Sequence, residues 1–153
     1  RVVDLNKPQL LKGFNEVTKG NGYYKARFST AASPKELIAG NYMLRSIYKA
    51  KNTDHVIYTM ESFEQYPDLH YATLDFKKSI RLTHGIDQQK DYLWGTAELV
   101  SWISLDGRKL EGVVYKPANF DPAKKYPMIV SFYERNSETL FNYRMPEPQS
   151  VYH

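Results

Sequence analysis

Residues 102–117 read WISLDGRKLEGVVYKP, a run with a turn signal at its centre. The dipeptide Asp106-Gly107 separates two stretches rich in β-branched and aromatic residues, 100–105 and 110–115. Asp-Gly tolerates the positive φ angles of a tight turn, so this run predicts a β-hairpin. Pro117 ends the second strand, because proline has no amide hydrogen to donate to a neighbouring strand.

A further strand signal lies in YPMIVSFY at residues 126–133. Asn-Phe-Asp-Pro at residues 119–122 supplies turn residues ahead of it. Met128-Ile129-Val130 is a short continuous apolar run, which is typical of a strand covered on both faces in a sheet flanked by helices. The run therefore predicts the first strand of an α/β core, beginning near Tyr126.

The upstream half of the chain is also rich in strand signals. Runs of β-branched and aromatic residues are separated by turn residues at 52–54 and 64–68; the runs span residues 42–51, 55–62 and 69–76. This spacing suits the antiparallel strands of a propeller blade. A short helix is predicted only at residues 33–39, where Ser33 can cap the helix and Pro34 suits its first turn.

The order of these motifs resembles the prolyl oligopeptidase family of serine peptidases, including its dipeptidyl-peptidase branch. The matching motifs are the Asp-Gly hairpin, Lys116-Pro117, Asn-Phe-Asp-Pro at 119–122, Lys-Lys-Tyr-Pro at 124–127, the apolar strand and Phe132-Tyr133. In that family a β-propeller precedes an α/β-hydrolase domain. The resemblance implies a mostly β chain, with the end of a propeller at residues 1–94 and the incomplete N-terminal part of the hydrolase domain at residues 95–153.

The family's catalytic machinery can be compared with the residues present. Its nucleophile lies in a Gly-x-Ser-x-Gly turn that exposes the serine hydroxyl, followed along the chain by an acid and a histidine. No serine of this chain has a glycine two residues away on each side. We therefore expect the catalytic serine, aspartate and histidine to lie outside this chain, which would be an inactive fragment by itself.

One residue with a catalytic role carries over from the resemblance. In this family the tyrosine that closes the Tyr-Pro-apolar-strand motif donates a hydrogen bond to the oxyanion, and here it is Tyr133. Such a donor contributes about 3 kcal/mol to lowering the barrier. Without the family, Tyr133 is simply an aromatic packing residue. The family usually has a small residue after this tyrosine, whereas Glu134 and Arg135 follow here and are predicted to be solvated surface charges.

The resemblance implies a fragment of a serine peptidase that hydrolyses short peptides, with a propeller restricting access. Dipeptidyl aminopeptidase, endopeptidase and esterase or acylaminoacyl-releasing activities all stay open, because fold analogy does not separate them. The expected partners are a peptide substrate and the remainder of the hydrolase domain, and the resemblance slightly favours a periplasmic or secreted enzyme. The alternative is a noncatalytic β-rich module that binds protein or carbohydrate through exposed aromatic residues.

Composition argues against other classes of function. The net charge of +4 is spread among alternating acids and bases, so nucleic-acid binding is not expected. The chain has no cysteine and its histidines, His55, His70, His84 and His153, are far apart, so neither a metal site nor a cofactor is predicted. It also lacks an apolar run of membrane-spanning length.

Overall fold

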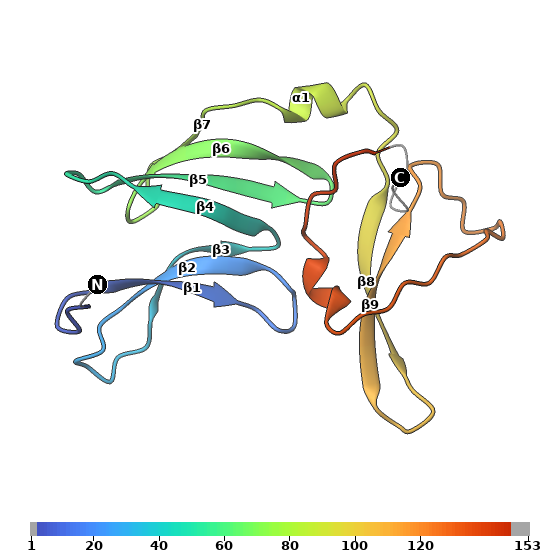
Figure 1. Ribbon diagram of the computed structural model, residues 1–153, viewed down its shortest axis with the longest axis horizontal. Coiled ribbons are helices and arrows are strands. Elements are labelled where there is room, and N and C mark those ends of the chain that lie inside the picture. The colour runs from blue at the N-terminus through green and yellow to red at the C-terminus, as the bar shows by residue number, and fades with distance from the viewer. Residues whose placement is uncertain (1–2, 148–153) are drawn as a thin grey trace.

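The computed structural model describes residues 3–147, which form three antiparallel sheets and little helix (Figure 1). The ends of the predicted domain ranges, at residues 1–2 and 148–153 with His153, lie outside the described residues. The elements are β1 (Gln9–Phe14), β2 (Asn21–Ala26), β3 (Lys35–Gly40), β4 (Met43–Lys49), β5 (His55–Ser62), β6 (Gln65–Thr73), β7 (Ser79–Arg81), α1 (Ile86–Gln89), β8 (Thr96–Ile103), β9 (Lys109–Lys116) and the 3₁₀ helix η1 (Asn136–Thr139).

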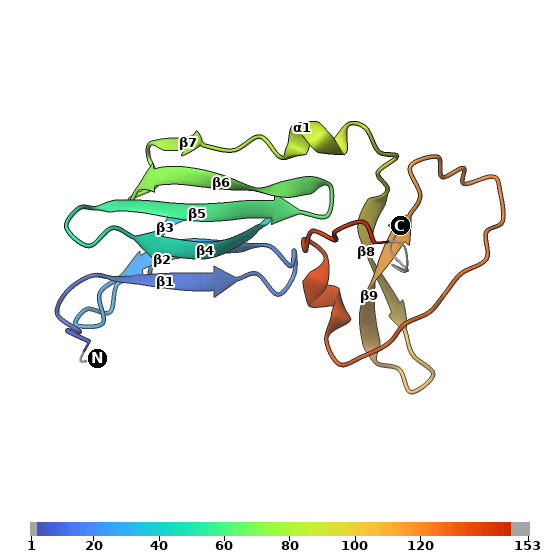
Figure 2. The same ribbon diagram turned by 45° about the horizontal axis from the view of Figure 1, so that its top comes forward.

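The first two sheets pack on one another, and the third stands beside them. Sheet β1-β2-β3 and sheet β4-β5-β6-β7 run in sequence order, so each is a simple meander. Figures 1 and 2 show the β8–β9 hairpin at one end of these two sheets, with the connection through α1 leading to it. Within residues 3–147, no helix is long and apolar enough to span a bilayer.

The core lies between the first two sheets and is largely aromatic. Its buried members are Tyr23, Leu44, Val56, Tyr58, Ala72 and Phe76. The rings of Tyr23 and Phe76 are stacked with centroids 5.7 Å apart, and Phe76 meets Tyr58 edge to face at 5.4 Å. Phe76 has a φ of 56°, an angle that is costly for a bulky residue, so this packing holds the turn after β6 in a strained conformation.

The buried side-chain amide of Asn21 links the two sheets by a hydrogen bond to the backbone of β4. Asn21, at the start of β2, accepts a 2.8 Å hydrogen bond from the Leu44 amide through its side-chain oxygen. Its own backbone amide donates to the carbonyl of Tyr42. The neighbouring Gly20 lies so close to the Gly40 carbonyl that a Cβ would stand 2.0 Å from that oxygen, which excludes any larger residue. The contact between the sheets therefore depends on both the amide and the glycine.

The strand predictions are largely confirmed. The hairpin predicted around Asp106-Gly107 is β8–β9, and Gly107 has the positive φ, 81°, that its turn requires. The predicted strands at residues 42–51 and 55–62 are β4 and β5. The predicted break at residues 64–68 is too long, because β6 begins at Gln65 and includes Pro67. The turn between β5 and β6 is correspondingly tight.

The prediction of a helix at residues 33–39 is wrong. Residues 35–40 form β3, which pairs with β2 along its length. Leu37 and Ile38 pack against the core between the sheets. Ser33 and Pro34 do give a local helix-start signal, but burial of these side chains against β2 outweighs it, as tertiary contacts commonly outweigh local propensity.

The prediction of a strand at residues 128–130 is also wrong. Residues 126–133 form neither strand nor helix, and Met128, Ile129 and Val130 are all exposed. A strand needs hydrogen bonds to a neighbouring strand, and no strand of the described residues pairs with this segment. Its apolar pattern is real, but the α/β core that it predicted is not formed within residues 3–147.

A fully buried carboxylate secures the exit from the second sheet. Asp68, in β6, accepts 2.7 Å hydrogen bonds from the Thr83 hydroxyl and from the Gly85 amide, and it lies 3.9 Å from Arg81. Thr83 in turn accepts a hydrogen bond from the Leu69 amide. A buried charge is stable only when it is paired in this way. Asp68 therefore fixes the path of the chain from β7 to α1.

The substitution Asp68→Ala tests this arrangement. It leaves the Thr83 and Gly85 donors and the Arg81 charge without their acceptor, so the free energy of unfolding should fall by about 3 kcal/mol. Urea unfolding followed by tryptophan fluorescence measures the change. The control is Asp87→Ala, which removes an exposed carboxylate paired with Lys90. A similar loss in both variants would show that the burial of Asp68 has no special effect.

A buried lysine joins the first sheet to the hairpin. Lys19, in the turn between β1 and β2, places its ammonium 2.6 Å from the Glu111 carboxylate of β9 and 2.6 Å from the Glu16 carbonyl. The hydrogen bond from Lys19 holds the pKa of Glu111 below its ordinary value of 4.5. Glu111 therefore stays ionised in the folded chain at pH values that would protonate an isolated glutamate.

This pair should make the stability of the chain depend on pH. Because the folded-state pKa of Glu111 is lowered, its stabilising effect is complete above about pH 4.5 and is lost as the pH falls through the lower folded value. The melting temperatures of the wild type and Glu111→Gln should therefore differ at neutral pH and converge in acid. Glu64→Gln, at an exposed turn, is the control and should follow the wild type. A constant difference across the pH range would contradict the assignment.

Candidate functional site

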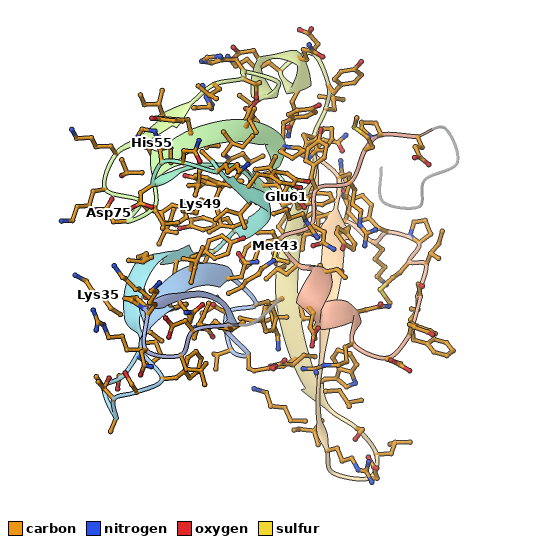
Figure 3. All side chains as sticks on the ribbon, turned by 60° about the vertical axis from the view of Figure 1, so that its left-hand side comes forward. Lys35, Met43, Lys49, His55, Glu61 and Asp75 are labelled. Atoms are coloured by element: carbon orange, nitrogen blue, oxygen red, sulfur yellow. The ribbon has the colours of Figure 1, made fainter. Side chains whose placement is uncertain are left out.

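The second sheet meets the C-terminal segment at an ion pair with an amide partner. Arg45 of β4 donates from Nε to Glu61 of β5 at 2.8 Å and from a terminal nitrogen to the Asn142 side-chain oxygen at 2.6 Å. Glu61 also accepts a 3.4 Å hydrogen bond from the Tyr143 amide. Figure 3 shows Glu61 and Met43 on the side of the sheet that faces the hairpin. We call Arg45, Glu61 and Asn142 the junction network.

Both charged members of the junction network lie where strand pairing is irregular. The register between β4 and β5 shifts between Arg45 and Tyr48, and Ser46 there has a φ of 52°. The register between β5 and β6 shifts between Met60 and Ser62, around Glu61. Such bulges turn side chains away from the regular alternation of a strand and are common next to functional sites. They aim Arg45 and Glu61 at the C-terminal segment.

Charged groups of both signs lie close together on this face. Glu61 is buried and paired, so its charge is compensated by Arg45. Lys12 of β1 lies near enough to respond to both groups. Partial burial and the positive charge of Arg45 lower the pKa of Lys12, while Glu61 opposes that shift. A cation, an ion pair and an amide thus share one face, and the charge-assisted hydrogen bonds among Arg45, Glu61 and Asn142 hold the C-terminal segment against the sheet.

Aromatic side chains cover the remaining part of the junction. Trp94 donates a 2.7 Å hydrogen bond from its indole nitrogen to the Phe63 carbonyl and stacks on Tyr143 with ring centroids 5.2 Å apart. Phe63 meets Tyr115 of the hairpin at 5.0 Å, and Tyr66 meets Tyr143 edge to face at 5.3 Å. Burial raises the pKa of Tyr143, with a smaller effect from Tyr66. This cluster holds the hairpin and residues 140–143 against the second sheet.

The predicted oxyanion donor, Tyr133, lies in the exposed segment ahead of this junction. Its side chain is 79% exposed, and it belongs to none of the strands of the described residues. Glu134 and Arg135 are both exposed, as predicted, and Arg135 also forms ion pairs with Glu16 of the β1–β2 turn and with Glu138 of η1. The structure therefore anchors the chain just after Tyr133, and it leaves the catalytic role of Tyr133 a prediction.

The histidines of the described residues are separated by the fold. His55 and His70 lie in β5 and β6, and His84 lies in the connection before α1. Within residues 3–147, no group of three or more histidine or acidic side chains is arranged to hold a metal ion. His70 stacks on Tyr58, and burial lowers its pKa. It is thus a half-buried side chain of an interior strand of the second sheet.

Sequence reasoning missed the junction network. Arg45 and Glu61 occur in runs that were predicted only as strands, and Asn142 lies in no predicted strand or helix. No local pattern pairs these residues, which are brought together by strand irregularities and by a contact across 97 positions of sequence. The aromatic side chains that pack beside the junction network were foreshadowed by the sequence, because tyrosine and tryptophan are abundant between residues 58 and 143.

Comparison with known proteins gives a match in fold alone. No family model matches the chain, and no curated protein matches it. Among solved structures, the chain is similar to the AtxE2 isopeptidase, S527A variant, with Astexin3-dC4 bound, at a TM-score of 0.62 and 13% identity over 86% of this chain and 20% of that chain. It is also similar to the AtxE2 isopeptidase in its apo form, at a TM-score of 0.57 and 12% identity over 80% and 18% of the two chains. The chain therefore spans about a fifth of the length of the isopeptidase it matches.

Proposed function

We propose that this chain is a segment of a serine peptidase of the prolyl oligopeptidase kind. In this proposal the first two sheets are consecutive blades at the end of a β-propeller, and residues from about 95 onward begin an α/β-hydrolase domain. The catalytic serine, aspartate and histidine come from residues outside the chain. The reaction is acyl transfer from a peptide or isopeptide bond to the serine and then to water. Removal of dipeptides from an amino terminus is one specificity within this class.

The observation that carries the proposal is the extent of the structural match. An isopeptidase structure matches 86% of the chain. Neither the first two sheets alone nor the hairpin alone makes up so large a share, so the match includes both. The identity of 13% means that this match reports fold, and the activity is inferred from it together with the motif order around Tyr133. Neither line of support depends on the other.

The exposed segment at residues 126–133 supports the same proposal. Met128, Ile129 and Phe132 are 77%, 79% and 89% exposed. Each such side chain gains about 1.5–3 kcal/mol when it is buried, so an uncovered run of them is costly in water. A neighbouring strand and flanking helices of a hydrolase sheet would cover this run. Tyr133 would then lie at the carboxyl end of that strand, where α/β enzymes hold their catalytic groups.

The substitution Tyr133→Phe tests the role of the predicted donor in the intact polypeptide. It removes one hydroxyl that would stabilise the oxyanion only in the transition state, so kcat for a fluorogenic peptide should fall about 100-fold with little change in KM. Tyr92→Phe is the matched control, because Tyr92 is also an exposed tyrosine and lies outside the proposed site. An unchanged kcat in Tyr133→Phe would remove Tyr133 from the mechanism.

Labelling with a fluorophosphonate tests the proposed peptidase function independently of the role of Tyr133. The probe reacts with activated serines, and the intact polypeptide should be labelled at a serine outside residues 1–153 in both the wild type and Tyr133→Phe. Labelling together with a normal kcat in the variant would keep the peptidase and discard the oxyanion role. The absence of labelling in the wild type would contradict the proposed function and favour the noncatalytic binding module.

A further inference from the structure

A cleft opens between the first two sheets at the end away from the hairpin. It has a volume of about 510 Å³ and is bordered by the start of β1, by β2 and β3, and by the turns that follow β4 and β6. Figure 3 shows His55 and Asp75 at this end, whereas Glu61 lies beside the hairpin. The cleft is thus separate from the junction network and from Tyr133.

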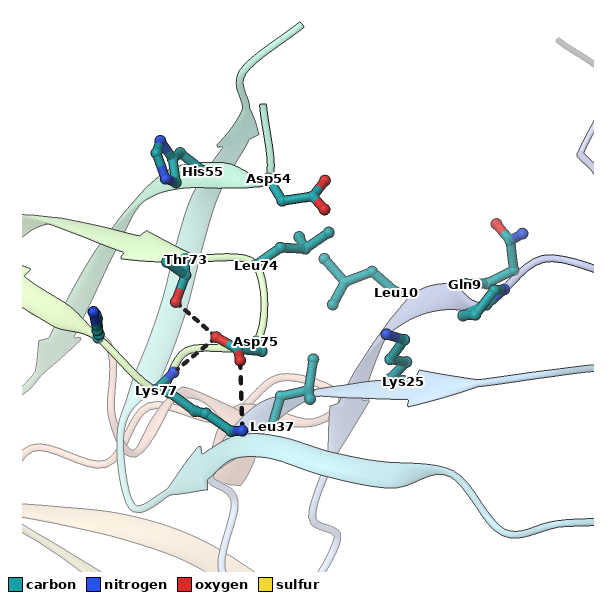
Figure 4. A pocket seen from close by; sticks show the side chains of 12 residues that line it. Gln9, Leu10, Lys25, Leu37, Asp54, His55, Thr73, Leu74, Asp75 and Lys77 are labelled. Carbon is teal, nitrogen blue, oxygen red and sulfur yellow. Dashed lines mark hydrogen bonds and ion pairs between the residues drawn. The ribbon is translucent and has the colours of Figure 1, made fainter. Parts of the chain in front are cut away.

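One part of the lining of the cleft is apolar. Leu10 comes from β1, Leu37 from β3 and Leu74 from the turn after β6. Leu37 and Leu74 also pack against the core between the sheets, so the apolar surface is continuous with that core. Figure 4 shows the three leucines converging on the space between the two sheets. An aliphatic group of a ligand would be buried here at a gain of about 0.8 kcal/mol for each methylene.

The rim of the cleft carries three lysines and two aspartates, and both aspartates are already paired with other groups. Lys25, Lys77 and Lys78 face two aspartates, Asp54 and Asp75. Asp54 is paired with Lys49 at 3.5 Å, outside the lining of the cleft.

The other aspartate is also occupied. Asp75 accepts a 2.6 Å hydrogen bond from the Thr73 hydroxyl and a 3.2 Å bond from the Lys77 amide, and it lies 3.9 Å from the Lys77 ammonium. Figure 4 shows these contacts turned toward its own loop. Of the described residues, none forms an ion pair with Lys25 or Lys78. These two lysines are therefore the groups available to an anion.

We propose that this cleft binds an aliphatic carboxylate, with the apolar part on the three leucines and the carboxylate at the rim to which Lys25 and Lys78 contribute. An aliphatic surface and unpaired ammonium groups line the same cleft, so the cleft matches a molecule that carries both an aliphatic group and a negative charge. The C-terminus of a peptide ending in a branched aliphatic residue has this chemistry, and so has a medium-chain fatty acid. The proposal stands on the cleft alone and does not depend on peptidase activity.

Calorimetric titration of the 153-residue chain tests the proposal. The ligands are acetyl-Ala-Ala-Leu with a free carboxylate, its C-terminal amide, acetyl-Ala-Ala-Ala with a free carboxylate, and decanoate. The leucine acid should bind at least about tenfold more tightly than its amide, because the amide lacks the charge that the lysines recognise. It should also bind several-fold more tightly than the alanine acid, because alanine lacks the aliphatic group. Decanoate distinguishes the source: tighter binding of decanoate than of the peptide acid assigns the cleft to fatty acids.

Charge variants locate the binding. Lys25→Gln and Lys78→Gln should each weaken binding of the leucine acid several-fold, and circular dichroism confirms that each variant is folded. Lys124→Gln, an exposed lysine in the connection after β9, is the matched control and should bind like the wild type. Equal affinity for acid and amide, equal effects in all three variants, or no heat of binding for any of the carboxylates up to about 10 mM would overturn the proposal.

Discussion

The packing of one sheet on the other around Tyr58, Tyr23 and Phe76 is the contact on which the rest of this structure depends. Each sheet alone would expose one apolar face, and small sheets are marginal without a partner surface. The aromatic rings fill the space between the sheets and force Phe76 into a left-handed backbone conformation. That turn in turn places Leu74 and Asp75 at the mouth of the cleft. The cleft is therefore shaped by the packing of the two sheets against one another.

Polar groups then set the position of the hairpin relative to the sheets. Lys19 reaches Glu111 from the first sheet, and Arg45 reaches Asn142 from the second. The ring of Trp94 on Tyr143 adds an apolar contact between the same parts. Each contact joins residues far apart in sequence, and each involves a group that is partly removed from water. Electrostatic contacts of this kind contribute little net free energy to folding, but they require a defined geometry. They therefore fix the orientation of the hairpin, while the core supplies the stability.

The sequence predicted those elements whose signals are local. The hairpin followed from Asp106-Gly107, and β4 and β5 followed from runs of β-branched and aromatic residues. The failures have one common cause, which is that the deciding contact lay elsewhere in the chain. Residues 33–39 have a helix start but are drawn into a strand by β2, and residues 128–130 have a strand pattern but no strand to pair with. Arg45, Glu61 and the cleft leucines needed strand register and bulges, which no local pattern encodes. The role of Tyr133 rests on family resemblance, because geometry gives it no partner in the described residues.

The exposed run from Tyr126 to Tyr133 has a consequence for the solution behaviour of the chain. Its proline-free part, residues 128–133, has high β propensity and no charged side chain, and these are the features of segments that form intermolecular cross-β contacts. Lys124 and Lys125 precede it, and Glu134 and Arg135 follow it. Flanking charges of this kind act as gatekeepers, because stacking identical segments in register would bring like charges together. The charged residues on either side of the run thus limit self-association while its apolar side chains are exposed.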